Sequence, residues 1–153
     1  MDNIEIVKAY YAALDSTDEE TVDGYISERY RLVDFAAQPM DRNAILAFIK
    51  QFKDAFPNLS HSLGNVRMEG NVVKLTVQLA GTNSKNLDLR NMGIGIIPRS
   101  RKFVIFPNSD YEFTIKDEKI DQAKVVSAPS PYRGFSGMLK ELGVNLSVLK
   151  VAV

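Results

Sequence analysis

The chain has 153 residues, of which 45% are hydrophobic and 25% charged, as expected for one globular domain with its own core. Nineteen Lys and Arg balance nineteen Asp and Glu, so no global field attracts nucleic acid or anionic lipid, and we expect neither nucleic acid nor a membrane as partner. The absence of cysteine excludes disulfides, thiolate metal sites and cysteine nucleophiles.

The first residues, Met1 to Glu5, are acidic and already helical in pattern, without the basic and apolar segments of a signal peptide. No apolar run approaches the ~20 residues that cross a bilayer. We therefore expect one cytoplasmic domain over residues 1–153.

Apolar residues recur at helical spacing near the start of the chain. They predict an amphipathic helix over residues 3–15, with Tyr10 at the edge of its apolar stripe. Thr17 and Glu20 form a capping-box pattern, which predicts a second, shorter helix. The apolar residues of that second helix are Val22, Tyr25 and Ile26.

A strand-like stretch, Tyr30 to Ala36, precedes a third predicted helix. Asp41 is placed to cap this helix, and Pro57 ends it because proline disfavours helical geometry at the preceding residue. Its apolar stripe consists of Ile45, Phe48, Ile49, Phe52 and Phe56.

From His61 onward the apolar period changes to two. Residues 62–69 and 72–81 flank the turn dipeptide Gly70-Asn71 and predict a hairpin. Residues 82–100 are rich in Asn, Gly and Ser, and we expect a long loop there that could serve as a lid.

The stretch from Arg101 to Ser127 alternates as two long strands joined at Asp117-Glu118. After Pro129-Ser130-Pro131 we expect a short helix that ends at Gly143. The apolar tail, residues 144–153, is expected to pack on its own sheet or on a second subunit. The apolar residues that fall on one side of this alternation are Phe103, Ile105, Tyr111, Phe113 and Ile115.

Three helices followed by hairpins predict an α+β fold, in which helices cover one face of a curved, mostly antiparallel sheet. Local strings support this order along nearly the whole chain. They are residues 6–14, Ala55-Phe56-Pro57-Asn58-Leu59, Glu69-Gly70-Asn71-Val72-Val73, Gly81-Thr82-Asn83, Glu118-Lys119-Ile120 and Leu142-Gly143-Val144. Together they resemble the nuclear transport factor 2-like superfamily and, within it, the SnoaL-like polyketide cyclases. The resemblance implies a cone-shaped roll with a deep apolar pocket, and a homodimer.

The resemblance also bears on chemistry. SnoaL-like cyclases carry Gly-Thr-His where this chain has Gly81-Thr82-Asn83, and a tryptophan followed by an acid where Lys124 and Ala128 stand. The acid that would move protons is therefore missing from this pattern. Our first hypothesis is a pocket that binds a small hydrophobic molecule, with or without a carbonyl group and with or without catalysis.

The alternative hypothesis is a cofactor-free isomerase or polyketide-cyclase-type enzyme. It rests on a similarity to ketosteroid isomerases, which implies Tyr10 on the first helix, Asp34 as general base and Tyr111 on a later strand. Tyr10 and Tyr111 would donate hydrogen bonds to the developing enolate oxygen. The competing interpretation makes Asp34 a surface residue and both tyrosines ordinary core residues.

Several further residues are assigned to the pocket wall. Lys124 could pair with Asp34, bind an anion or form a Schiff base, or it could be an ordinary exposed lysine. The predicted pocket residues are Lys124, Gln122, Val126, Phe52, Phe56 and Phe113.

His61, the single histidine, is expected at the surface, and without a second histidine or a cysteine we predict no metal site and no cofactor. The basic residues of the long loop and its exit could bind an anionic substrate or be solvated. They are Arg90, Arg99, Arg101 and Lys102.

Overall fold

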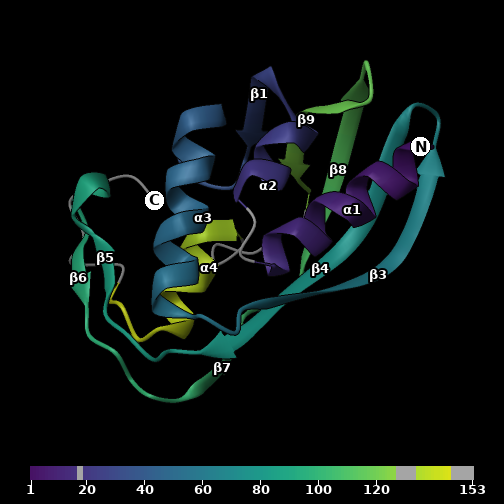
Figure 1. Ribbon diagram of the computed structural model, residues 1–153. Helices are drawn as coiled ribbons and strands as arrows, with labels where there is room; N and C mark the ends of the chain where they lie inside the picture. Colours follow the sequence, from purple (N-terminus) through teal and green to yellow (C-terminus); the bar gives the residue numbers. More distant parts are fainter. Residues whose placement is uncertain (17–18, 127–133, 146–153) are drawn as a thin grey trace.

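We describe residues 1–16, 19–126 and 134–145 of the chain from a computed structural model (Figure 1). The helices lie against one face of a strongly curled sheet, so the predicted α+β roll is confirmed. α1 contacts β3, β4 and β9, whereas α3 contacts β1 and β2. The space between these two helices and the sheet is where the core and the candidate site lie.

The helices begin at side-chain caps that the sequence contains. Asp2 caps α1, where its carboxylate accepts from Glu5 N at 2.8 Å and the Glu5 carboxylate accepts from Asp2 N at 3.3 Å. Asp41 caps α3 as predicted, accepting from Ala44 N at 2.9 Å. The helices are α1 (Asn3–Asp15), α2 (Glu19–Tyr25), α3 (Arg42–Ala55) and α4 (Gly134–Glu141), with a 3₁₀ turn at Arg90–Met92.

The second helix differs from its prediction at its end. Thr17, the proposed cap of the second helix, lies outside the described residues. Ile26 is not helical, because it begins strand β1 and is buried there.

Seven strands form the main sheet, in the order β2-β1-β9-β8-β4-β3, with β7 also paired to β4. Among the described strands of this sheet, β1 and β9 alone run parallel, paired at Ile26 and again over Arg31 to Val33; the other pairs are antiparallel. β5 and β6 form a separate hairpin. The strands are β1 (Ile26–Val33), β2 (Met40–Asp41), β3 (Ser60–Glu69), β4 (Val72–Thr82), β5 (Leu87–Leu89), β6 (Gly95–Ile97), β7 (Phe103–Ile105), β8 (Ser109–Lys116) and β9 (Lys119–Val125).

Both predicted hairpin turns are present. Gly70 has φ 62° between β3 and β4, a backbone angle that glycine adopts without strain. Asp117 and Glu118 have φ 52° and 61° between β8 and β9, the two positive angles of a type I′ turn.

The long strand predicted from Arg101 is interrupted. β7 ends at Ile105, and Phe106 is buried while Phe103 and Ile105 are 61% and 53% exposed. Pro107, which follows, has no N–H to donate to a strand ladder, so β8 begins again only at Ser109. The inward assignment of Phe103 and Ile105 is therefore wrong.

Residues 82–100 are not a structureless loop. They contain β5, the 3₁₀ turn and β6, and the side chains of Leu87 and Leu89 are fully buried. The Gln51 amide of α3 donates to the carbonyl of Asp88 at 2.9 Å, which fastens the small hairpin to the helix. A role as a lid stays a prediction.

The closing helix ends as predicted. Gly143 has φ 82°, its N–H donates to Lys140 O at 2.9 Å, and Val144 N donates to Leu139 O at 3.0 Å. These two bonds form a Schellman motif that satisfies the last carbonyls of α4. The Pro129-Ser130-Pro131 stop and most of the apolar tail lie outside the described residues.

Within the described ranges, no helix combines the length and the apolar character needed to cross a bilayer.

Candidate active site

A cavity of about 80 Å³ lies between α1, α3 and the concave face of the sheet. Its wall is mostly aromatic and aliphatic, and its polar groups are four tyrosine hydroxyls, one imidazole and one ammonium. The lining residues are Tyr10, Tyr11, Leu14, Tyr30, Leu32, Phe35, Ile45, Phe48, Ile49, Phe52, Lys53, Leu59, His61, Val77, Leu79, Tyr111, Phe113, Ala123 and Met138.

The structure places four of the predicted site residues on this wall. Tyr10, Tyr111, Phe52 and Phe113 all line the cavity. Phe56 does not, because it lies behind Phe52, fully buried, with the two rings stacked at 5.8 Å between centroids.

The tyrosines present neutral hydroxyls to the cavity. Burial raises the pKa of Tyr10 and of Tyr111 far above the ordinary value, and the Tyr30 hydroxyl partly offsets this for Tyr10 by hydrogen bonding. Burial likewise raises the pKa of Tyr11 and of Tyr30. All four stay protonated near neutral pH. Tyr30 donates to Tyr10, and the hydroxyls of Tyr10, Tyr11 and Tyr111 are donors suited to an oxygen on which negative charge develops.

Asp34 does not lie on the cavity wall. β1 ends at Val33, and Asp34 follows in a left-handed conformation with φ 61°. Its side chain is 48% exposed, and its Oδ2 lies 4.0 Å from Nζ of Lys124, which is 44% exposed. The carboxylate is thus a surface group next to a surface lysine, so the expectation of an Asp34 base within the cavity is wrong.

Three other assignments to the pocket wall are wrong because of a β-bulge. Thr114 pairs with Gln122 and Ile115 with Ile120, so Asp121 is an extra residue in β9. After the bulge Ala123 and Val125 are the buried positions, and Ala123 lines the cavity. The residues left on the outer face are Gln122, Lys124 and Val126.

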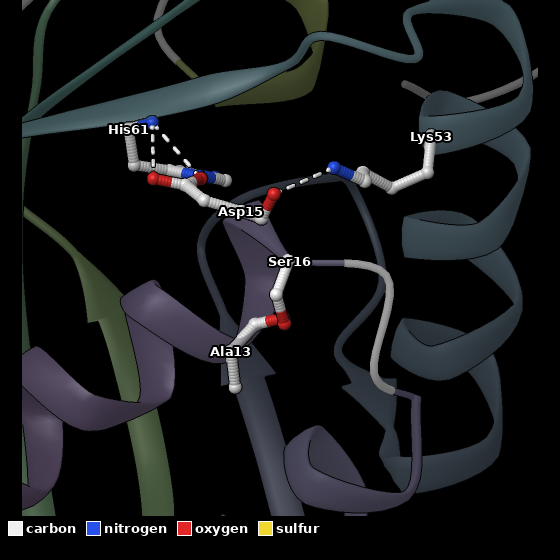
Figure 2. Close-up of polar contacts among 5 residues, drawn as sticks. All are labelled: Ala13, Asp15, Ser16, Lys53 and His61. Carbon is white, nitrogen blue, oxygen red and sulfur yellow. Dashed lines mark hydrogen bonds and ion pairs between the residues drawn. The ribbon is translucent and has the colours of Figure 1, made fainter.

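His61 is a cavity residue that the sequence interpretation missed. Its side chain is only 9% exposed, it lines the cavity, and its Nδ1 lies 2.6 Å from Oδ1 of Asp15 (Figure 2). The main-chain N–H of His61 also donates to both Asp15 oxygens at 3.1 Å. The expectation of a surface histidine is therefore wrong.

The elements around this pair hold it in place. Asp15 is the last residue of α1, and His61 is the second residue of β3. The Nζ of Lys53, from α3, donates to the main-chain carbonyl of Asp15 at 3.1 Å, and the ring of Tyr11 lies 5.1 Å from the imidazole between centroids. Figure 2 shows Asp15 between His61 on one side and Lys53 on the other.

This geometry defines the imidazole tautomer. A carboxylate can only accept a hydrogen bond, so Nδ1 is protonated and donates to Asp15. Nε2 is then the basic nitrogen. Within the described part of the chain, Nε2 has no hydrogen-bond partner. A base held by a carboxylate next to neutral donors is a proton-transfer arrangement.

Asn83, at the position where the resemblance implies a histidine, has a structural role. It is 1% exposed, its Nδ2 donates to Lys85 O at 3.0 Å and its Oδ1 accepts from Ser100 N at 2.8 Å. Its main chain pairs with Lys102 and Arg101. The side chain thus closes the base of the segment that carries the β5–β6 hairpin.

No group of three or more His, Asp or Glu side chains suited to a metal ion occurs among the residues that the structure describes. Besides the tyrosines, the titratable groups found at the cavity are the His61 imidazole with its Asp15 carboxylate and the Lys53 ammonium.

Comparison with known sequences identifies the family. Residues 7–123 match the sequence profile of the SnoaL-like domain. The chain belongs to the SnoaL-like family. No functionally curated protein matches it at a significant level.

Solved structures of SnoaL-like and related proteins share the fold. AclR from Streptomyces galilaeus, a candidate hydroxylase, is 16% identical with a TM-score of 0.69, over 91% of this chain and 93% of that one. IdmH from Streptomyces antibioticus, a candidate polyketide cyclase, is 20% identical with a TM-score of 0.67, over 94% and 100%. A protein with a ketosteroid isomerase-like fold from Catenulispora acidiphila, bound to trimethylamine, is 15% identical with a TM-score of 0.64, over 92% and 94%.

Proposed function

We propose that this SnoaL-like domain binds a small carbonyl compound in its cavity and transfers a proton at the carbon next to the carbonyl group. His61 is the general base, and Asp15 orients it. The contact of 2.6 Å between Asp15 Oδ1 and His61 Nδ1, on the wall of an apolar cavity, is the observation that carries the proposal.

The proposed step needs no cofactor. Nε2 of His61 takes the proton from carbon, the C–H electron pair becomes a carbon–carbon double bond, and the carbonyl π electrons move to oxygen. A tyrosine hydroxyl donates a hydrogen bond to that oxygen, and the Asp15 carboxylate stabilises the imidazolium that forms. Return of a proton to carbon, at the same or a conjugated position, gives exchange or isomerisation.

The size of the cavity limits the substrate. Its volume is about 80 Å³, whereas an apolar cavity of about 150 Å³ holds benzene. A substrate with several fused rings therefore does not fit inside. The volume favours a molecule no larger than one small ring, or one end of a longer molecule.

The other function that the family supports is binding without catalysis. The same cavity serves both functions, so the reactivity of a bound ketone decides between them. The homodimer and the cytoplasmic location expected from the sequence also stay predictions.

The test is deuterium uptake by cyclopentanone, a ketone with one five-membered ring, in D2O followed by proton NMR. We expect the protein to accelerate loss of the signal of the protons next to the carbonyl, and His61→Gln to lower the rate by at least about 100-fold. Binding of cyclopentanone without acceleration, or a rate that His61→Gln leaves unchanged, would overturn the catalytic proposal in favour of a binding module.

A further inference from the structure

A second hollow adjoins the cavity. It has a volume of about 470 Å³ and lies between the end of α1, α2 and α3. Leu14, Ile49 and Lys53 line both spaces. These three side chains therefore lie at the junction of the two spaces.

Lys53 is the charged group at this junction. It is half-buried, and its ammonium donates to the main-chain oxygen of Asp15 at 3.1 Å. Figure 2 shows the Asp15 carboxylate turned to His61, so that only the main-chain oxygen of Asp15 faces Lys53. Two of the three ammonium donors have no partner among the described residues.

The other charged groups of the hollow do not neutralise Lys53. Glu20 and Asp54 are exposed to solvent. Asp23 forms an ion pair with Arg42. Nζ of Lys53 has no carboxylate within ion-pairing distance in the described part of the chain.

We infer that the substrate of this site is a carbonyl compound that carries a carboxylate, and that Lys53 binds the carboxylate. This inference rests on the proposed function and names its substrate class. The charge-assisted contact places the anion at the junction and directs the carbonyl end into the cavity. Because Lys53 and His61 contact the same residue, Asp15, the anion lies close to the base that takes the proton.

The test compares two ketones that differ only by the carboxylate, cyclopentanone and 3-oxocyclopentane-1-carboxylate. Each rate of deuterium uptake is divided by the rate in buffer alone, which removes the intrinsic difference in acidity. We expect kcat/KM to be about tenfold higher for the carboxylate, mainly through a lower KM, since the contact forms equally in the ground state and the transition state.

Three lysine variants separate charge from structure. Lys53→Met should remove the tenfold difference between the two ketones, and Lys53→Arg should retain most of it. Lys50→Met is the matched control, because Lys50 lies on the same helix and lines the hollow but not the cavity. Thermal unfolding of each variant checks that it folds.

The outcomes distinguish the two proposals. Equal normalised rates for both ketones, or a Lys53→Met variant that slows both alike, would overturn the carboxylate site and leave the catalytic function standing. Saturation-transfer NMR measures binding in parallel. Binding of the carboxylate that depends on Lys53, without deuterium uptake, would support the anion site and overturn catalysis, and binding of neither ketone would overturn both.

Discussion

The carboxylate of Asp15 receives three hydrogen bonds from His61, one from the ring Nδ1 at 2.6 Å and two from the main-chain N–H at 3.1 Å. These contacts join the last turn of α1 to the start of β3 at the wall of the cavity. They orient the ring and place the proton of the neutral imidazole on Nδ1, so that Nε2 is the unprotonated nitrogen.

Asp15→Asn removes this charge while keeping the shape of the side chain. We expect the rate of deuterium uptake by cyclopentanone to fall about 10- to 100-fold, because the amide stabilises the imidazolium less than the carboxylate does. The free energy of unfolding should fall by about 1–2 kcal/mol with the loss of charge-assisted bonds. Asp34→Asn is the matched control. Its carboxylate is 48% exposed and off the cavity wall, so a loss of rate in that variant would contradict our assignment.

The buried tyrosines predict how stability depends on pH. Burial raises the pKa of Tyr10, Tyr11, Tyr30 and Tyr111 in the folded state, while in the unfolded chain they ionise near pH ~10. Above pH ~10 the unfolded state binds fewer protons than the folded state. The free energy of unfolding is therefore constant with respect to these groups below that pH and falls as the pH rises above it. The slope is about 1.4 kcal/mol per pH unit for each tyrosine. Urea unfolding measured at increasing pH checks this. A free energy of unfolding that does not change above pH ~10 would contradict the burial of the four phenols.

Substitution of Asn83 tests whether its side chain stabilises the base of the segment that carries the β5–β6 hairpin. Asn83→Ala should lower the free energy of unfolding by about 2–3 kcal/mol, because it leaves the main-chain groups of Lys85 and Ser100 without their partner. Asn86→Ala is the control, since Asn86 is exposed and accepts a single bond, from Arg99 N at 2.9 Å. Equal losses in the two variants, measured by urea unfolding, would show that burial of Asn83 does not matter.

Substitution of Gly134 tests the close packing of the start of α4 against the main chain of Phe35, just after β1. A Cβ at this position would lie 2.4 Å from Phe35 O, and Gly134 also has φ 62°. Gly134→Ala should therefore cost more than about 2 kcal/mol of stability, whereas Gly70→Ala, with the same φ and no atom within 4 Å, should cost about 1 kcal/mol. If the two variants unfold at the same urea concentration, the close approach of α4 to Phe35 is wrong.

Most of the architecture could be predicted from the sequence because it depends on local signals. The Asp41 cap, the turn at Asp117-Glu118 and the αL glycine Gly143 each act within a few residues. Periodicity likewise placed Phe52 and Phe113 on the cavity wall.

The site could be predicted only in part, because its decisive features are not local. Asp15 and His61 are 46 residues apart, and no spacing rule joins the end of a helix to the start of a strand. The bulge at Asp121 reverses the parity of β9, so Lys124, which the resemblance places at a pocket position, lies on the outer face. Within the polar stretch 82–100, the alternation of Leu87 and Leu89 was the one sequence signal that could have predicted the buried strand β5.

The nitrogen-15 NMR spectrum of the imidazole tests the central claim most directly, since the chain contains one histidine. In its neutral form His61 should carry the proton on Nδ1, and the signal of the unprotonated Nε2 should shift when cyclopentanone is added. A proton on Nε2, together with an imidazole signal that cyclopentanone leaves unchanged, would contradict the account of His61 as the base of this cavity.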